Sequence, residues 1–265
     1  MPADADAPGR NRGEPVDSAR AYQAAHAVRA LEHLAFHPRS APELAVGLQV
    51  HPRTARRLLH RLAREQYVTL TPGPRRRYEL TFRLAALGRQ AIAHSRLPRV
   101  AGPWVATLAA QTGRRAGLWL PCYSDAVCIL AADAGAPVPE PELGALLPAH
   151  ASAPGKALLA HRQAWRDGVL SRALERHTSR TVTDPRELVV ELDRIRARGY
   201  ATDHGEHNPE VHALAVPVDI DSQPMAALAV SLTADRLATR ETEDLAALLI
   251  ELARSLGASI DDSPR

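Results

Sequence analysis

The segment Pro52–Glu65, PRTARRLLHRLARE, constrains the fold more than any other part of the sequence. At about 100° per residue, its apolar side chains fall on one side of a helix and its basic side chains form a narrow stripe on the opposite side. The apolar set is Ala55, Leu58, Leu59 and Leu62, and the basic set is Arg53, Arg57, His60 and Arg64. We therefore predict a helix that buries its leucines against a core and turns a row of arginines outward.

Positive charge is concentrated in the N-terminal part of the chain. Residues 20–97 contain 14 arginines and 4 acidic residues, whereas residues 98–259 contain 16 basic and 20 acidic residues. The net charge of +3 is therefore the sum of a basic N-terminal part and a mildly acidic C-terminal part. Of the 33 basic residues 32 are arginine, and Lys156 is the only lysine. Because uneven charge of this kind favours a polyanionic partner, we expect one for the N-terminal part.

Helix and turn signals surround the basic helix in a defined order. Alanine and leucine at helical spacing follow Tyr22 and stop before Pro38, and Ser40 with Glu43 forms a capping box that starts a short helix at 41–47. After the basic helix, two β-rich runs predict a hairpin. Three helices followed by a basic hairpin are typical of a winged helix-turn-helix. The hairpin runs are YVTLT (67–71) and RRYEL (76–80), around Pro72, Gly73 and Pro74.

The basic helix and the hairpin predict binding to double-stranded DNA. Arginine binds phosphate oxygens, or the edge of guanine through two hydrogen bonds, and a recognition helix presents its N-terminal residues to the major groove. The hairpin arginines then reach the backbone or the adjacent minor groove. The alternative is a solvated basic face without a partner. The predicted DNA-binding residues are Ser40, Arg53, Thr54, Arg56, Arg57, His60, Arg75, Arg76 and Arg77.

The C-terminal half mixes strands and helices without strict alternation, which predicts an α+β fold with an antiparallel sheet. A boundary between the halves is expected at Pro98, Gly102 and Pro103. Strands are expected near 116–120, 126–132, 200–203, 213–218 and 225–232, and residues 133–144 are expected to form a loop. Helices are expected near 84–95, 104–111, from 154, from 164, at 185–198 and at 240–256.

The winged helix-turn-helix pattern, together with three later blocks, resembles the IclR family of bacterial transcription regulators. The blocks are LPAHASAPGKALLA (147–160), TDPRELVVELDRIRARGYATDHGE (183–206) and ALAVPVDIDSQPMAALAVSL (213–232), and the likeness covers about residues 21–260. It implies a DNA-binding domain, a helical linker and a GAF-like effector-binding domain. It also implies a homodimer or homotetramer, and repression or activation governed by a small metabolite, often an organic acid or an aromatic compound.

The resemblance sets the expected domain organisation and the expected effector site. The predicted domains are a disordered tail (1–20), a winged helix-turn-helix (21–82), a linker helix (83–103), the effector-binding domain (104–260) and a short tail (261–265). The start of a helix at 152–156 offers backbone amides that suit a carboxylate ligand. The effector-binding residues carried over by motif are Ala153, Pro154, Gly155, Asp203, Val211 and Ala213.

The sequence departs from the family pattern at three places. Gln49 stands where the family usually has a glycine in the helix-turn-helix bend, and His51-Pro52-Arg53 replaces the usual opening of the recognition helix. Pro154 has no amide hydrogen to offer a ligand. Lys156 is interpreted as a structural or surface lysine, because the family pattern has lysine at that position.

Two further clusters leave alternatives open. Asp203, His204, Glu206, His207 and His212 invite a metal-sensing hypothesis, although their spacing matches no established site, and surface histidines are the alternative. Cys122 and Cys128 flank a short turn and match no zinc motif. They are interpreted as partly buried small residues, with a redox switch as the alternative.

Composition excludes several classes of function. The chain has no P-loop, no G-x-G-x-x-G and no G-x-S-x-G, so neither a cofactor nor catalytic residues are predicted, and an enzyme carrying a DNA-binding domain is the less favoured hypothesis. A winged-helix protein-interaction module is another. The N-terminus lacks the apolar core of a signal peptide, and no apolar run is long enough to span a membrane, so we expect a cytoplasmic protein.

Overall fold

The structure is a computed structural model that describes residues 14–73, 75–133, 136–137, 143–232 and 239–262. It divides into two compact units, residues 1–91 and residues 92–265. The boundary between the units falls within the predicted linker, residues 83–103. Each unit is described by itself.

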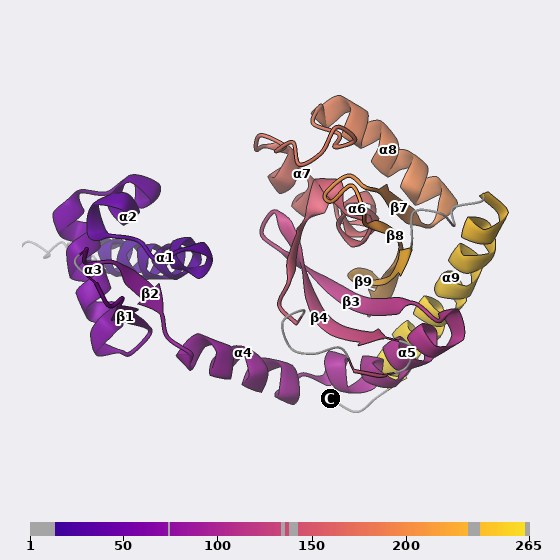
Figure 1. The fold of residues 1–265 in the computed structure, drawn as a ribbon, viewed down its shortest axis with the longest axis horizontal. Helices are drawn as coiled ribbons and strands as arrows, with labels where there is room; N and C mark the ends of the chain where they lie inside the picture. Colours follow the sequence, from indigo (N-terminus) through magenta and orange to yellow (C-terminus); the bar gives the residue numbers. More distant parts are fainter. Residues whose placement is uncertain (1–13, 74, 134–135, 138–142, 233–238, 263–265) are drawn as a thin grey trace, which may run out of the picture. The chain divides into compact units, whose positions relative to one another are not determined.

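The N-terminal unit is built from helices and a two-stranded hairpin, in the predicted order (Figure 1). Residues 14–20, predicted as part of a disordered tail, belong to the first helix, so this part of the prediction is wrong; residues 1–13 lie outside the described residues. The elements are α1 (Glu14–Phe36), α2 (Ala41–Leu48), α3 (Pro52–Arg64), β1 (Val68–Leu70) and β2 (Tyr78–Leu80).

A small apolar core holds this unit together. Leucines from the three helices pack against Val68 of β1 and Tyr78 of β2, both of which are buried. The backbone of Arg39 exchanges two hydrogen bonds with the backbone of Tyr78, at 2.7 and 3.0 Å, which ties the loop before α2 to the hairpin. The helical contributors to the core are Ala30, Leu34, Ala41, Leu44, Leu48, Leu59 and Leu62.

The predicted capping box at the start of α2 is confirmed. The Ser40 hydroxyl accepts a hydrogen bond from the Glu43 backbone at 3.4 Å, and the Glu43 carboxylate accepts one from the Ser40 backbone at 2.8 Å. At the other end, Gln49 adopts the left-handed conformation, with φ 55°. The chain therefore makes the sharp helix-turn-helix bend without glycine, at a cost of roughly 1 kcal/mol for the crowded Cβ.

The connection between the units differs from the prediction in one respect. Helix α4 (Arg83–His94) follows the hairpin, and α5 (Arg96–Thr112) begins after Ser95. The segment Pro98–Pro103, predicted as a break between domains, lies inside α5. Pro98 falls in the first turn, where a missing amide hydrogen costs no helical hydrogen bond, and the helix continues through Pro103.

The C-terminal unit contains an antiparallel sheet, as predicted. Its strands run in the order β5-β4-β3-β9-β8-β7, with β6 paired to β4. Two short strands differ from the prediction. Strand β5 lies within the segment 133–144 that was predicted as a loop, and β6 begins just after that segment. The strands are β3 (Arg115–Cys122), β4 (Asp125–Asp133), β5 (Ala136–Pro137), β6 (Leu146–Pro148), β7 (Ala201–His204), β8 (His212–Ile220) and β9 (Gln223–Leu232).

Helices cover both faces of this sheet (Figure 1). On β8 and β9 the side chains alternate, so that Leu214, Val216, Leu228 and Val230 pack toward α5 and α9. The intervening alanines pack toward α6, α7 and α8. The remaining helices are α6 (Ala153–His161), α7 (Gln163–Leu170), α8 (Pro185–Arg198) and α9 (Thr239–Asp262), with a 3₁₀ turn at Ala149–Ala151 before α6.

Replacing Gln49 by glycine tests the strain in the helix-turn-helix bend. We expect Gln49→Gly to raise the free energy of unfolding of the N-terminal unit by about 0.5–1 kcal/mol, because glycine adopts positive φ without steric cost. The slowest amide hydrogen exchange in α3 measures this free energy for the unit alone. Gln49→Ala is the control, since it keeps the Cβ; an equal gain in both variants would contradict a backbone origin.

Candidate functional site

The outer face of α3 carries the predicted arginine row. Ala55, Leu59 and Leu62 are buried on the inner side. Within the described residues, no ion pair engages the exposed guanidinium groups of α3. The side chain of His51 caps the helix by accepting a hydrogen bond from the Arg53 backbone at 3.2 Å. The exposed arginines are Arg53, Arg56, Arg57, Arg61 and Arg64.

A groove of about 250 Å³ runs along α3 beside α1. Thr54 and Arg57 line it from α3, and Gln23 lines it from α1. The Arg61 guanidinium donates a hydrogen bond to the side-chain oxygen of Gln23 at 2.9 Å, which fixes one edge. Arg57 therefore stands at the border of the outer row, where its guanidinium is exposed.

The hairpin arginines are not equivalent. Arg75 and Arg76 are exposed, whereas Arg77 is half-buried and turns back onto its own unit. Its guanidinium donates to the Pro38 carbonyl at 2.7 Å and to the Glu43 carboxylate at 2.5 Å. The Ser40 backbone N–H, and then Arg77, lower the pKa of the Glu43 carboxyl. Arg77 thus anchors the hairpin to the start of α2.

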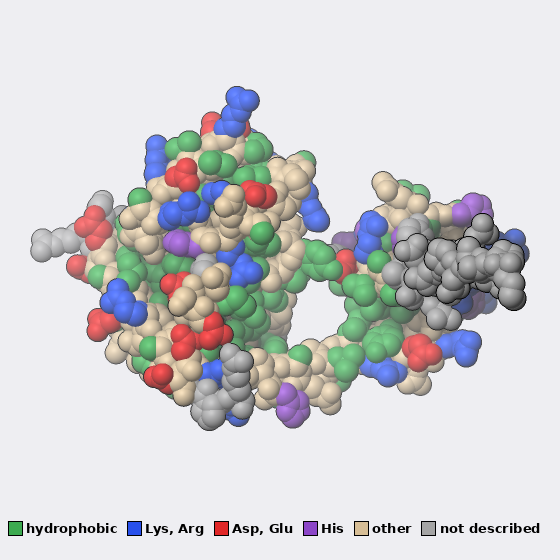
Figure 2. Space-filling model, turned by 180° about the vertical axis from the view of Figure 1, so that it is seen from behind, with side chains coloured by type: hydrophobic (Ala, Val, Ile, Leu, Met, Phe, Trp, Pro, Cys, Tyr) green, Lys and Arg blue, Asp and Glu red, His purple; other side chains and the backbone are tan. Residues whose placement is uncertain are grey.

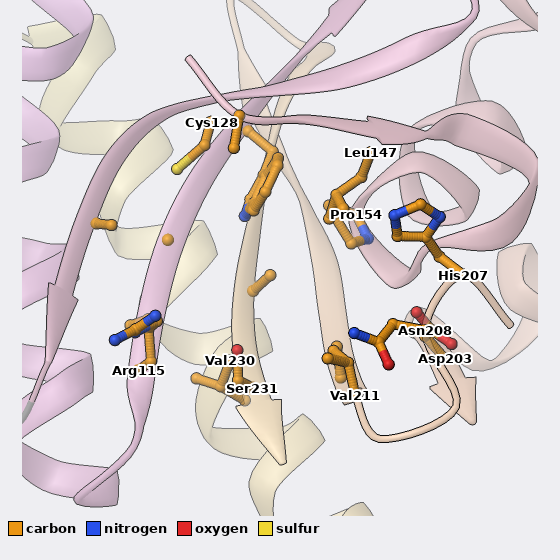
Figure 3. A pocket seen from close by; sticks show the side chains of 17 residues that line it. Arg115, Cys128, Leu147, Pro154, Asp203, His207, Asn208, Val211, Val230 and Ser231 are labelled. Atoms are coloured by element: carbon orange, nitrogen blue, oxygen red, sulfur yellow. The ribbon is translucent and has the colours of Figure 1, made fainter. Parts of the chain in front are cut away.

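The C-terminal unit contains a cavity of about 300 Å³ on the alanine face of the sheet (Figure 3). Of the predicted effector residues, Pro154, Asp203, Val211 and Ala213 line it. Ala153 and Gly155 do not line it, and both are buried. Besides those four predicted residues, the lining comprises Arg115, Ala116, Gly117, Trp119, Cys128, Ala131, Ala145, Leu147, His207, Asn208, Ala229, Val230 and Ser231.

Gly155 shapes the cavity wall from behind. A Cβ atom at this position would lie 2.3 Å from the Ala149 backbone, so the 3₁₀ turn packs directly against α6 only because residue 155 is glycine. This contact fixes where α6 begins, and with it the position of Pro154 at the cavity. Gly155 is therefore a packing residue, and its predicted contact with an effector is not seen in the cavity lining.

Asp203 is the buried carboxylate of the cavity. Its side chain is 3% exposed, and its Oδ1 accepts a hydrogen bond from the Glu206 backbone at 2.8 Å. Burial raises the pKa of Asp203 to about 6, while the hydrogen bond from Glu206 works in the opposite direction. Hydrogen bonds from the backbone therefore favour the ionised form of Asp203, whereas its burial away from water disfavours that form and has the larger effect.

A buried ion pair lies next to Asp203. The Lys156 ammonium, on α6, donates to the Glu206 carboxylate at 2.5 Å, and the two side chains are 3% and 8% exposed. Thr178 and Thr181 donate their hydroxyls to the Glu206 carbonyl, which fixes the loop after β7. Of the two interpretations of Lys156, structural or surface, its burial and its ion pair support the structural one.

The predicted histidine and acid cluster is dispersed by the strands. His204 and His212 face each other across β7 and β8, with ring centroids 6.1 Å apart. His207 instead points toward the cavity and contacts the ring of His177, with centroids 4.9 Å apart. In the described part of the chain no three such donors come together to hold a metal ion. The metal-sensing alternative therefore has no site there.

The two cysteines lie on neighbouring strands at different levels. Cys122 lies opposite Asp125 and Cys128 lies opposite Trp119 in the β3–β4 ladder. They are not joined by a disulfide. Cys128 is buried, lines the cavity and directs its thiol to the Leu130 carbonyl at 3.2 Å, while Cys122 is half-buried. Partial burial, the favoured interpretation of the pair, describes Cys122, whereas Cys128 is buried.

A family model described as the C-terminal domain of the bacterial transcriptional regulator IclR matches residues 89–258, more than half of the chain. The chain belongs to the IclR family. Its members and the relatives below are transcriptional regulators, not enzymes. Within the described residues, no helix combines the length and the apolar character needed to cross a bilayer.

Individual relatives agree with this assignment. The HTH-type transcriptional regulator BhcR of Paracoccus denitrificans is 39% identical over 110 residues, an alignment that spans 40% of this chain and 39% of BhcR. The crystal structure of an IclR transcriptional regulator from Alicyclobacillus acidocaldarius is 29% identical, with a TM-score of 0.69, over 90% of this chain and 98% of that one. An IclR homolog from Microbacterium hydrocarbonoxydans, crystallised with 4-hydroxybenzoate, is 24% identical, with a TM-score of 0.65, over 91% and 100%.

Alternation along β3 was the sequence signal for three of the cavity residues that the motif comparison missed. Arg115, Gly117 and Trp119 occupy every second position of this strand, and all three line the cavity of this IclR protein. Because side chains of a strand alternate between faces, these three residues lie on the same face, and assigning one of them to the cavity assigns the other two. The sequence does not reveal which strand lies beside β9, so the set could not be joined to Asp203 in advance.

Removing Lys156 tests the buried ion pair. We expect Lys156→Met to lower the free energy of unfolding of the C-terminal unit by about 3–5 kcal/mol at neutral pH, because Glu206 is left charged and unpaired. Trp104, Trp119 and Trp165 all lie in this unit, so tryptophan fluorescence in urea reports it alone. The double variant with Glu206→Gln is the control and should recover part of the loss. Equal stability of Lys156→Met and the unaltered protein would refute the pairing.

The raised pKa of Asp203 predicts a pH-dependent stability difference. Because its folded pKa of about 6 exceeds the reference value of 3.8, ionisation of Asp203 opposes folding; the penalty grows from pH 3.8 and is complete above pH 6. Asp203→Asn removes this penalty. The free energy of unfolding of the variant, relative to that of the unaltered protein, should therefore be about 1 kcal/mol higher at pH 7.5 than at pH 5. Urea unfolding at both pH values measures the gain. A difference that is constant across this range would rule out the shift.

Proposed function

We propose that this protein is a DNA-binding transcription regulator, acting as a repressor, whose operator affinity depends on a small molecule bound in the C-terminal cavity. The observation that carries the proposal is the exposed arginine row of α3, backed by a buried leucine seam. In contrast, acidic and basic side chains are interspersed over the face of the C-terminal unit that Figure 2 shows. Since DNA lies in the cytoplasm of a bacterium, we place the protein there.

The DNA contacts divide by position. Arg53, Thr54, Arg56 and Arg57 occupy the first two turns of α3, which a recognition helix presents to base edges, and His60 follows one turn later. Arg75 and Arg76 at the hairpin suit phosphate contacts. Ser40 and Arg77 are already engaged in the capping box and its ion pair, so we assign them to positioning of the hairpin and α2.

A homodimer, or a homotetramer built from dimers, is the proposed assembly. Phe82, at the start of the linker, is 93% exposed, and Leu87 of α4 is 44% exposed. The described side chains of α4 include none that is buried, although several are apolar. Exposed apolar side chains of this kind mark interaction surfaces. Two copies would read two half-sites related by symmetry.

The cavity has the dimensions and the polarity of a site for a small effector. Its volume of about 300 Å³ suits an organic acid or a single-ring aromatic compound. Arg115 supplies a positive charge, and Asp203 supplies an acceptor. An effector changes operator affinity only as far as it binds one state of the protein better than the other. The proposed effector residues are Pro154, Asp203, Val211 and Ala213, together with Arg115 and Ser231.

Replacing Arg57 tests the DNA contact. We expect Arg57→Ala to weaken binding to a duplex that the unaltered protein selects from a random-sequence pool by about 5- to 100-fold, through loss of a base or phosphate contact. Fluorescence anisotropy at fixed salt measures the dissociation constant, and hydrogen exchange verifies that α3 remains folded. Arg186→Ala, which removes an exposed arginine from the C-terminal unit, is the control.

Salt dependence separates this function from a protein-interaction module. Several phosphate contacts give a steep negative slope of log K against log salt, and Arg57→Ala should reduce it if the contact is to phosphate. Unchanged affinity in Arg57→Ala, or a slope near zero for the unaltered protein, would remove the arginine row from DNA recognition.

A further inference from the structure

A row of four side chains crosses the floor of the cavity from one charge to the opposite charge. The β7–β8 ladder places Asp203 opposite Ala213, and the β8–β9 ladder places Ala213 opposite Ser231. The β9–β3 ladder pairs Val230 with Ala116, so its next antiparallel step brings Ser231 beside Arg115. Figure 3 shows Arg115 and Asp203 on opposite sides of the cavity, with Ser231 between them.

The spacing of the strands sets the length that a ligand must have to reach both ends. Arg115 and Asp203 are separated by the strands β9 and β8, and therefore by three inter-strand steps. At about 4.8 Å per step, their backbones lie roughly 14 Å apart. The two side chains take up part of this span. The remaining gap suits one aromatic ring that carries a substituent at each end.

Most of the side chains that line the cavity between its two charged ends are apolar, and the Ser231 hydroxyl is the polar group in the row between them. Ala213, Ala229, Trp119 and Leu147 are among these apolar lining residues. Pro154 brings a ring to this wall where most residues would bring an amide hydrogen. A polar ligand centre would lose its hydrogen bonds to water here without replacement, so the centre of the ligand should be apolar.

The Asp203 end carries an unbalanced negative charge. Lys156 and Glu206 neutralise each other at 2.5 Å, and Asp203 adds a second buried carboxylate beside them. Burial lowers the pKa of the neighbouring His207 imidazole, so at pH 7 this ring does not supply a compensating charge. A buried charge of this kind is costly without a partner, and a cationic ligand group would provide one.

The Arg115 end can accept a carboxylate. Its guanidinium contacts Asp133 at 3.2 Å, and both side chains are about half-exposed. An ion pair so exposed contributes about 0–1 kcal/mol and constrains the arginine weakly. A guanidinium has five N–H donors in a planar fork, which allows it to serve a ligand carboxylate and Asp133 together.

The geometry points to a zwitterionic effector, whose carboxylate binds Arg115, whose protonated amine binds Asp203, and whose flat apolar centre lies over Ala213 and Ser231. The chemical class is an aminoalkyl-substituted aromatic acid. This inference rests on the proposed function in one respect, namely that the cavity is the effector site. It goes further in naming both charged ends of the ligand.

Four probes of one shape test the inference on the full-length protein by calorimetry at pH 7.5. They are 4-(aminomethyl)benzoate, 4-methylbenzoate, 4-methylbenzylamine and 4-hydroxybenzoate, which together vary the two ends of one ring. We expect 4-(aminomethyl)benzoate to bind at least tenfold more tightly than the three others. Weaker or equal binding of this probe would overturn the inference.

Matched variants assign each end of the ligand. Asp203→Asn should abolish the preference for 4-(aminomethyl)benzoate over 4-methylbenzoate while leaving the binding of 4-methylbenzoate unchanged. Arg115→Gln should weaken both of these acids at least tenfold and spare 4-methylbenzylamine. Asp133→Asn is the control for Arg115, since it removes the carboxylate that lies 3.2 Å from the guanidinium and keeps Arg115 itself, and it should not weaken acid binding. A preference that survives in Asp203→Asn would contradict the assignment of the amine.

Operator binding distinguishes failure of this inference from failure of the proposed function. If 4-methylbenzoate or 4-hydroxybenzoate binds as tightly as the zwitterion and shifts operator affinity, the cavity is an effector site but its ligand is a simple acid. If 4-(aminomethyl)benzoate binds with the expected preference and operator affinity stays constant, the ligand class stands and effector control fails.

Discussion

On β8 and β9, leucine and valine side chains point to one face of the sheet, and Ala213, Ala215, Ala227 and Ala229 point to the other. The large side chains build the core with α5 and α9, whereas the alanines let α6 lie close to the sheet while a cavity stays open beside its first turn. Larger residues at Ala213 or Ala229 would fill that cavity. The same alternation that stabilises the sheet therefore creates the space for a ligand, and Gly155 fixes the helix that closes it.

Charge is used differently in the two units. In the N-terminal unit, the arginines of α3 are exposed. One hairpin arginine, Arg77, instead forms an ion pair with Glu43, which holds the hairpin against α2. In the C-terminal unit, the single lysine of the chain is buried against Glu206. Exposed charge suits recognition of a polyanion, and buried paired charge orders a loop. The residue type alone does not tell these uses apart.

Local signals in the sequence predicted most elements, and tertiary contacts decided the rest. The capping box at Ser40 and the periodicity of α3 act within one or two turns, so their structures follow from neighbouring residues. Pro98 and Pro103 predict a break by their local chemistry, whereas the burial of α5 against the sheet, which keeps the helix continuous, depends on residues distant in the sequence. At the cavity, Asp203 and Pro154 followed from motifs, whereas Arg115 is brought to them only by the strand order.

Trp119 has a consequence beyond its place in the cavity wall. The other two tryptophans, Trp104 on α5 and Trp165 on α7, do not line the cavity. The emission of an indole shifts when the indole loses contact with water. If the cavity is the effector site, as proposed, Trp119 is an optical reporter of its occupancy, and the N-terminal unit contributes no tryptophan signal.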